Sequence, residues 1–503
     1  MTDGRGAPLK GAALAVTALA LALGTFMQVL DLTIANVSLP TIAGDLGVSP
    51  DTSTWIITSF TIANGMSVPL TGWLMARYGI VRVFLASLMI FTLASLLCGL
   101  AWNLPVLILF RILQGAGSGP MVPGAQALMI SIFPADRRST ALGIATIMTL
   151  VGPIAGPVLG GYISDNWHWS WIFLINVPVG LFVGLVIART LSGNDTPTRK
   201  LPIDSVGLGL LVIWVGAMQT TLDLGRNADW FSSPMIVTLA LVAGVVFLAW
   251  LIWELTDAHP IVDLSLFKSR NFAIGTIGLC LAFGVFFGNI LLLPLWLQTQ
   301  QGYTATWAGM VAAPSGIMSI ILMPFITRLM RSVDARLIAS FSLLALAGAY
   351  VLRASYTTDV GYYELAIVSV VQGIGAGSFF LSLLTILLDG VPAAQLPSAI
   401  GLSNFCRLVV SGFAASMTTT MWDRREAFHQ SHIVEVATPA AAPFAEMMRR
   451  MGDMGMHGRA AEMAMQGQVI KQAYLLSTVD LYWAFALMTA ALAGLVWFTR
   501  RSA

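Results

Sequence analysis

Two ionisable side chains lie inside long apolar runs of the sequence: Asp31 in QVLDLTIANVSLP, residues 28–40, and Arg111 in RILQGAGSG. An aspartate near the centre of a membrane-spanning helix costs about 2.5–3.5 kcal/mol on insertion scales, so such residues pair with one another and mark ion or proton pathways. Burial disfavours the charged form of a carboxyl group, whereas a neighbouring cation favours it. We therefore predict that Asp31 carries a proton and that Arg111 is its partner. The alternative is that the pair only fixes helix packing.

Polar and small residues accompany both groups. Thr33 and Asn36 follow Asp31 by two and five residues, and Asn36 can share its helix face and supply hydrogen bonds. Gln114 and Gly115 follow Arg111 by three and four residues. We predict that these four residues belong to a substrate cavity beside the proton site.

The composition places these residues in a membrane. The chain has 503 residues, of which 57% are hydrophobic and 10% charged, against about 25% charged in a typical soluble domain. Apolar runs long enough to cross the roughly 30 Å hydrocarbon layer recur along the chain. They are centred near residues 25, 65, 90, 117, 150, 180, 214, 245, 285, 316, 345, 375, 409 and 489. The sequence predicts an all-α polytopic membrane protein with fourteen transmembrane helices, and its net charge of +2 gives no indication of nucleic-acid binding.

Lys and Arg residues set the expected orientation, because they concentrate in cytoplasmic loops. With the N-terminus inside the cell, most basic loop residues become cytoplasmic: Arg77, Arg82, Arg137, Arg138, Arg189, Arg199, Lys200, Lys268, Arg270, Arg328, Arg331 and Arg336. The short loops of the other face then hold only Arg226 and Arg353. Both termini are predicted to be cytoplasmic, and the first apolar run is interpreted as a retained helix rather than a cleaved signal peptide.

An internal repeat divides the chain. LQGAGSG at 113–119 returns as VQGIGAG at 371–377, and PLTGWLM at 69–75 is echoed by PFITRLM at 324–330, at offsets of 258 and 255. Parallel repeats of this kind characterise transporters whose substrate site lies between the halves. We predict a six-helix bundle in 1–200, two inserted helices in 201–260 that lie outside the interface of the halves, and a second six-helix bundle in 261–503.

The two halves differ in charge. Ser369 takes the place of Arg111 before the second Gln, and Asp31 advanced by 255 residues corresponds to Phe286. Proton chemistry is therefore expected in the first half. Arg407 is interpreted equally as a cation that extends toward the cytoplasmic interface or as a site residue, and Asp204 and Asp223 as interfacial residues at the ends of an inserted helix.

These motifs resemble those of the major facilitator superfamily, and specifically of its fourteen-span drug:proton antiporter branch with the EmrB-type multidrug exporters. LDLTIANVSLP resembles the first-helix motif of that branch, RILQGAGSG the fourth-helix motif, and GPIAGPVLGG at 152–161 the fifth-helix antiporter motif. GWLMARYGIVR at 72–82 resembles the cytoplasmic loop motif, with Gly72, Arg77 and Gly79 fitting a tight basic turn. Ala76 stands where that motif has an aspartate, which departs from its charge-relay pattern.

The antiporter motif also has a physical interpretation of its own. Gly152, Gly156 and Gly160 repeat every four residues and form a smooth helix face, continued by Gly161, which lets a neighbouring helix approach closely. Pro153 and Pro157 each remove a backbone donor and favour a bend. The resemblance implies that this helix is a barrier to proton leakage.

One sizeable soluble segment is predicted, the outer loop 423–478. The spacing of Phe444, Met447, Met448 and Met451 predicts an amphipathic helix. The methionine cluster within 444–465 fits an adaptable contact surface better than a Cu(I) site. The resemblance implies a periplasmic adaptor of the EmrA type and an outer-membrane channel like TolC. We predict that residues 440–475 form helices that either contact the adaptor or close the mouth of the exporter itself.

The predicted function is proton-driven export of hydrophobic, chemically varied drugs across the bacterial inner membrane. No phosphate-binding loop, metal-ligand spacing or nucleophile motif is present, so we expect neither an enzyme nor a cofactor or metal. One proton crossing 100 mV releases about 2.3 kcal/mol, enough for a roughly fifty-fold drug gradient. The alternatives are a solute:proton symporter of the same fold and a membrane sensor or scaffold that transports nothing.

Overall fold

The computed structural model describes residues 9–500 except for 135–136, 192, 194, 197, 199–203, 227, 258–259, 393–394, 437–445, 447, 451–452, 454 and 456. The described residues form helices and connecting turns, with no strand. The helices are α1 (Gly11–Asp45), α2 (Pro50–Ser53), α3 (Trp55–Ser67), α4 (Thr71–Tyr78), α5 (Ile80–Gly99), α6 (Leu104–Ser118), α7 (Met121–Ile132), α8 (Arg138–Asn166), α9 (Trp171–Leu174), α10 (Asn176–Leu191), α11 (Ser205–Gly225), α12 (Pro234–Thr256), α13 (Arg270–Gln300), α14 (Ala305–Leu329), α15 (Ala335–Arg353), α16 (Tyr362–Leu388), α17 (Leu396–Val436) and α19 (Arg459–Leu495).

The prediction of an all-α polytopic membrane protein is confirmed. Each of the fourteen predicted centres falls within one of these helices. Within the described part of the chain, twelve helical segments are long and apolar enough to cross a membrane. The other two centres lie in α3, which spans only 13 residues before the chain turns at Pro69, and in α8, where only Thr140–Thr149 counts as an apolar segment.

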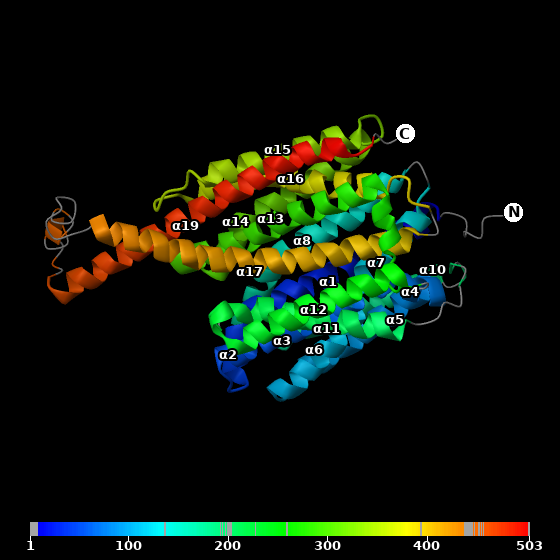
Figure 1. Ribbon diagram of the computed structural model, residues 1–503, viewed down its shortest axis with the longest axis horizontal. Coiled ribbons are helices and arrows are strands. Elements are labelled where there is room, and N and C mark those ends of the chain that lie inside the picture. The colour runs from blue at the N-terminus through cyan, green and yellow to red at the C-terminus, as the bar shows by residue number, and fades with distance from the viewer. Residues whose placement is uncertain are drawn as a thin grey trace.

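The helices run roughly parallel to one long axis, and α1 begins at the end of the bundle where α19 finishes (Figure 1). We call this the terminal end and the opposite one the distal end. The contacts of the two halves correspond: α3 packs on α6 as α14 packs on α16, and α5 packs on α6 as α15 packs on α16. Contact between α8 and α14 joins the halves along one side.

The halves also meet at the terminal end. The amide of Asn404 in α17 donates to Oε1 of Gln126 in α7 at 3.0 Å. A Cβ added to Gly72 in α4 would lie 3.0 Å from Cα of Ser398 in α17. The glycine therefore allows α4 and α17 to touch, and the terminal end is closed on this side.

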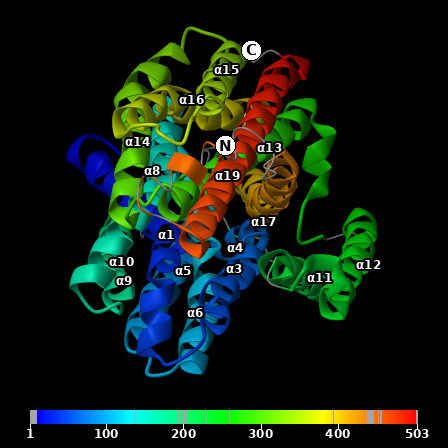
Figure 2. The ribbon, with the colours of Figure 1, turned by 90° about the vertical axis from the view of Figure 1, so that its left-hand side faces the viewer.

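The two inserted helices lie beside the bundle, with α12 farther out than α11 (Figure 2). The prediction that both stay outside the interface of the halves is wrong for α11, which contacts α3 of the first half and α17 of the second. Oγ of Ser416 in α17 donates to the carbonyl of Leu222 at 2.9 Å. Helix α12 packs chiefly on α11, and most of its side chains are exposed.

The prediction of helices within 440–475 is confirmed from Arg459 onward, where α19 begins. The bounds 423–478 of the outer segment are wrong, because Asp423 lies inside α17, which continues to Val436, and Thr478 lies inside α19. Both helices extend past the rest of the bundle at the distal end (Figure 1). Ion pairs contribute to their contact: Asp480 accepts from Arg425 at 2.5 Å and lies 2.7 Å from His429. Phe444, Met447 and Met451 lie outside the described residues.

Candidate functional site

Asp31 and Arg111 form an ion pair in the interior of the first half. Nη1 of Arg111 lies 2.6 Å from Oδ2 of Asp31, and the two side chains are 1% and 0% exposed. Asp31 comes from the middle of α1 and Arg111 from the middle of α6. Neither group contacts bulk water, so only protein groups can compensate their charges. One proton on Asp31 would change the net charge of the pair from zero to +1.

Three further side chains complete a polar network around the carboxylate. Gln114, one turn after Arg111, donates from Nε2 to Oδ1 of Asp31 at 2.9 Å and accepts from Arg111 at its own Oε1 at 2.8 Å. Asn176, at the start of α10, donates to the same Oδ1 at 3.2 Å. Its amide also lies 3.0 Å from Oγ of Ser95 in α5. Donors from α6 and α10 therefore bind this carboxylate, and the network as a whole joins α1, α5, α6 and α10.

Arg111 has partners besides the carboxylate. Its Nε donates to the carbonyl of Ile56 at 3.0 Å, and its guanidinium carbon lies 4.1 Å from the ring centroid of Phe60. The ring of Phe173 covers it from 5.5 Å. Aromatic faces and a carbonyl dipole stabilise a cation in a water-free site. Arg111 therefore keeps acceptors when the carboxylate takes up a proton.

Glycines set the helix spacing that the network needs. A Cβ on Gly152 would lie 2.7 Å from Cγ1 of Val29, and one on Gly160 would lie 2.8 Å from the carbonyl of Ile34, while one on Gly156 would meet Oγ1 of Thr33. The three glycines thus seat α8 directly against the segment of α1 that carries Asp31. In the same way Gly115 faces the carbonyl of Phe60 and brings α6 against α3.

The other residues of these motifs are placed as follows. Thr33 donates to the carbonyl of Leu30 at 3.1 Å, and Gly161 is buried in α8. The side chains of Asn36, Pro153 and Pro157 lie outside the described part of the chain.

The second half holds a matching buried cluster around Arg353. Advanced by 258 residues, Asp31, Ser95, Arg111 and Gln114 correspond to Asn289, Arg353, Ser369 and Gln372. Arg353 donates to Oδ1 of Asn289, to Oγ of Ser369 at 3.1 Å and to Oε1 of Gln372 at 2.6 Å. It is 1% exposed, so the expectation of a loop position was wrong, and Asn289 rather than Phe286 is the counterpart of Asp31. Relative to the first half, the arginine and the serine occupy each other's helices, and the amide of Asn289 stands where the first half has the carboxylate of Asp31.

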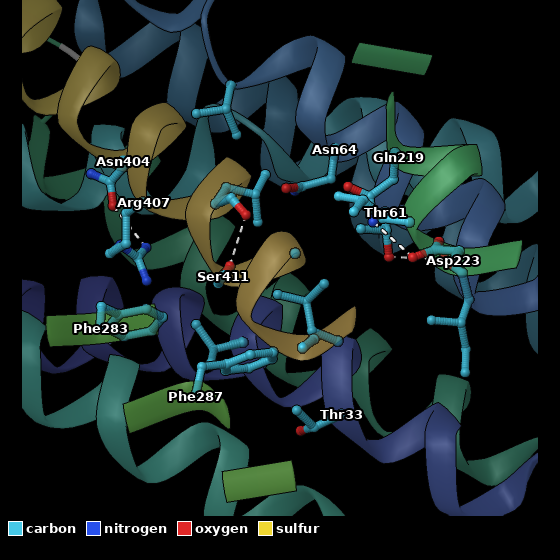
Figure 3. A pocket seen from close by; sticks show the side chains of 18 of the residues that line it. Thr33, Thr61, Asn64, Gln219, Asp223, Phe283, Phe287, Asn404, Arg407 and Ser411 are labelled. Atoms are coloured by element: carbon cyan, nitrogen blue, oxygen red, sulfur yellow. Dashed lines mark hydrogen bonds between the residues drawn. The ribbon is translucent and has the colours of Figure 1, made fainter. Parts of the chain in front are cut away.

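A cavity of about 380 Å³ lies between the two halves (Figure 3), and its wall includes Leu32 and Thr33, which follow Asp31 in α1. Neither Asp31 nor Arg111 faces it. Of the predicted cavity residues, Thr33 faces it, whereas Gln114 and Gly115 do not. Helix α11 contributes Gln219, Leu222 and Asp223 to its wall, and Arg226 follows directly after the helix, so Asp223 is a cavity residue as well as a residue near a helix end. Arg407 also faces the cavity.

The loop motif forms the predicted turn. Gly79 adopts a φ of 94°, a conformation that favours glycine, and the backbone amide of Val81 donates to Oδ1 of Asp195 at 3.1 Å. Arg77 lies over the rings of Trp73 and Tyr78 at 5.3 and 5.6 Å. Asp195, which follows α10, thus places a carboxylate beside the turn from elsewhere in the sequence.

Sequence reasoning missed Asn176, Ser95, Gln219 and the Arg353 cluster. Placing a carboxamide or hydroxyl group in a membrane-spanning helix costs less free energy than placing a charged group there. Its presence in an apolar run is therefore weaker evidence of a functional site. The repeat offset of 258, applied to every polar residue around Asp31, identifies Asn289 and Arg353.

The comparisons with known proteins agree with this geometry. The family model of the Major Facilitator Superfamily matches residues 21–415. The chain is 46% identical over 495 residues to the multidrug export protein EmrB of Escherichia coli K12, covering 98% of this chain and 96% of that protein. It is 41% identical over 493 residues to the fatty acid resistance protein FarB of Neisseria gonorrhoeae, covering 98% and 97%. The structure of the proton:xylose symporter XylE shares the fold with a TM-score of 0.62 at 13% identity, covering 97% and 96% of the two chains. The chain belongs to the Major Facilitator Superfamily and resembles EmrB-type multidrug exporters over nearly its whole length.

Proposed function

We propose that the protein is a proton-driven exporter of hydrophobic, chemically varied drugs. The observation that carries this proposal is the buried ion pair of Asp31 and Arg111 beside a cavity between the two halves. Similarity over 98% of the chain to a protein named as a multidrug exporter supports the same function. The coupling role of Asp31 is part of the proposal.

The proposed coupling follows from the network. When Asp31 is charged, Arg111, Gln114 and Asn176 all bind it and hold α1 against α6 and α10. A proton on Asp31 removes the ion pair, whereas Arg111 keeps Ile56 and Gln114 as acceptors. Protonation thus loosens α1 without leaving a cation unsatisfied. Two conformations that differ in this contact bind the proton with different affinity, which is the requirement for coupling.

We further propose the membrane setting. The terminal end faces the cytoplasm, and the distal end with the extensions of α17 and α19 faces the periplasm of a bacterial inner membrane. In this orientation the contacts of Gly72 with Ser398 and of Asn404 with Gln126 close the cytoplasmic side. The division into bundles 1–200 and 261–503 with an insertion at 201–260 belongs to the same proposal.

The test is Asp31→Asn in purified protein reconstituted into vesicles with an imposed pH gradient. The amide keeps the shape of the carboxyl group but cannot bind and release the proton. We expect the variant to fold and to bind drug, but to lose proton-driven drug transport. Asp45→Asn is a matched control on the same helix, because Asp45 is half exposed and bonds to Trp169 and His168 outside the network. Near-normal transport by Asp31→Asn would place the coupling carboxylate elsewhere.

A further inference from the structure

Three charged side chains outside the proton network line the cavity, and two of them, Asp223 and Arg407, have no ion pair among the described residues, whereas Arg226 pairs with Asp423. Asp223 on α11 and Arg407 on α17 both face it. Figure 3 shows them on opposite sides of the pocket, with Ser411 and Phe287 between them. Apolar side chains make up much of the remaining wall, among them Leu222, Phe283, Phe287, Leu291 and Leu408.

Asp223 has neutral hydrogen-bond partners, Thr58 and Gln219, but no ion pair among the described residues. Its Oδ1 accepts from Nε2 of Gln219 at 2.9 Å, one helical turn earlier. Its Oδ2 is buried and has no hydrogen-bond partner among the described residues. Arg226, the nearest basic residue in sequence, instead binds Asp423 at 2.7 Å. No ion pair of Asp223 occurs within the described part of the chain, so one carboxylate oxygen remains available to a ligand.

Arg407 has the opposite charge and the same lack of a counter-ion. Its Nη2 donates to Oδ1 of Asn404 at 2.8 Å, and its guanidinium carbon lies 4.4 Å from the ring centroid of Phe283. Its Nε is buried without an acceptor among the described residues. The ring and the amide orient the guanidinium but do not neutralise it. An uncompensated buried charge is costly, and a ligand group of opposite sign removes that cost.

We infer that the cavity is a bipolar substrate site, with a cation-binding end at Asp223 and an anion-binding end at Arg407. This inference rests on the proposed function and names the substrate class: lipophilic ions of either charge, whose apolar bodies contact Phe287 and its neighbours. The inserted helix α11 is the element that supplies the cation-binding end. A fourteen-helix chain thereby gains a substrate contact that neither six-helix bundle contains.

The test uses two probes of nearly equal size and shape but opposite charge, tetraphenylphosphonium and tetraphenylborate. Binding to the purified full-length protein in detergent is measured for Asp223→Asn and Arg407→Gln, with the double variant as a blank for detergent partitioning. We expect Asp223→Asn to weaken binding of the phosphonium by about tenfold, equivalent to about 1.4 kcal/mol, and to leave the borate bound. Arg407→Gln should show the reverse.

Charge-conserving variants separate binding from folding. Asp223→Glu and Arg407→Lys should retain the charge preference of the parent, and thermal unfolding of all four single variants checks that they fold. An equal loss of both probes in Asp223→Asn, or no loss of either, overturns the inference. A separate outcome distinguishes this inference from the proposed function. If the parent binds both ions and each variant loses the expected one, the bipolar site stands. If a pH gradient then drives neither ion across the vesicle membrane, the proposed function fails.

Discussion

Arg111 and Arg353 are both fully buried guanidinium groups, yet only Arg111 has a carboxylate. In the second half the acceptors of Arg353 are Asn289, Ser369 and Gln372, which are all neutral. The first-half cluster can therefore change its charge by taking up a proton, whereas the second-half cluster keeps a fixed positive charge. We propose that the second cluster is the rigid counterpart of the first.

Asn289→Ala tests how far this fixed cation depends on its amide partner. Loss of a hydrogen bond to a charged group inside a protein costs about 1.5–3 kcal/mol. We expect the free energy of unfolding in detergent to fall by about that amount, measured by denaturant titration. Asn166→Ala is the control, because Asn166 is exposed and its amide bonds, among the described residues, only to the nearby carbonyl of Tyr162. Equal stability of the two variants would show that Arg353 does not need Asn289.

The sequence predicted the ion pair because charge in an apolar run is costly enough to need a partner. It did not predict Asn176, since an asparagine is tolerated in many environments and lies 145 residues from the carboxylate that it binds. Asp223 was interpreted as interfacial from its place near a helix end, although that end borders the cavity. The position of a residue along its own helix does not show which other helices lie next to it.

At the scale of elements, the packing of α1 on α8 decides where Asp31 lies. Gly156→Ala places a methyl group against the side chain of Thr33 and 3.2 Å from the backbone nitrogen of Ile34. We expect overpacking to lower the free energy of unfolding by about 1–3 kcal/mol and to weaken coupled transport as α1 is displaced. Thermal unfolding and vesicle transport measure the two effects.

The matched control for that substitution is Gly348→Ala in α15. A Cβ at Gly348 meets no heavy atom within 4 Å. Alanine should stabilise that helix by up to about 1 kcal/mol, since glycine has the lower helix propensity. Equal changes in unfolding temperature and in transport for the two variants would contradict a specific α1–α8 contact.

The glycine spacing in the sequence indicated a close helix contact but not its partner. Likewise, hydropathy located the inserted helices but not their side of the bundle. Helix α11 meets both α3 and α17, and that choice depends on shape and on contacts such as Ser416 with Leu222, which are set in three dimensions.

At the scale of the molecule, we propose that residues 437–458, which connect the extensions of α17 and α19, contact the periplasmic adaptor. The two extensions are joined by Arg425 and His429 on Asp480 and by Trp422, whose Nε1 donates to Thr478 at 2.8 Å. Replacing residues 437–458 with a short Gly-Ser linker leaves these contacts in place. We expect drug resistance of cells to fall, while transport by the purified protein in vesicles stays unchanged. Unaltered cellular resistance would remove the partner proposal.

The overall architecture was the most predictable part, because membrane-spanning helices need long apolar runs and repeats preserve their order. For the outer segment, the sequence predicted helices within 440–475 but not how far α17 and α19 extend into it. Ion pairs and indole hydrogen bonds contribute to these extensions, and hydropathy does not measure such contacts.

The neutral side chain of Asn289, in the place that the repeat gives to Asp31, has an electrical consequence. In the proposed mechanism Asp31 is the carboxylate that exchanges the proton, and we expect a single proton to return per cycle. The net charge that crosses the membrane then depends on the exported compound. When a neutral compound leaves, one net positive charge moves inward, and this movement releases about 2.3 kcal/mol per 100 mV of membrane potential. With a monovalent cation no net charge moves, and the voltage contributes nothing. With a monovalent anion two charges move, and the same voltage contributes twice as much. The membrane potential alone would then favour the export of anions over neutral compounds, and of neutral compounds over cations.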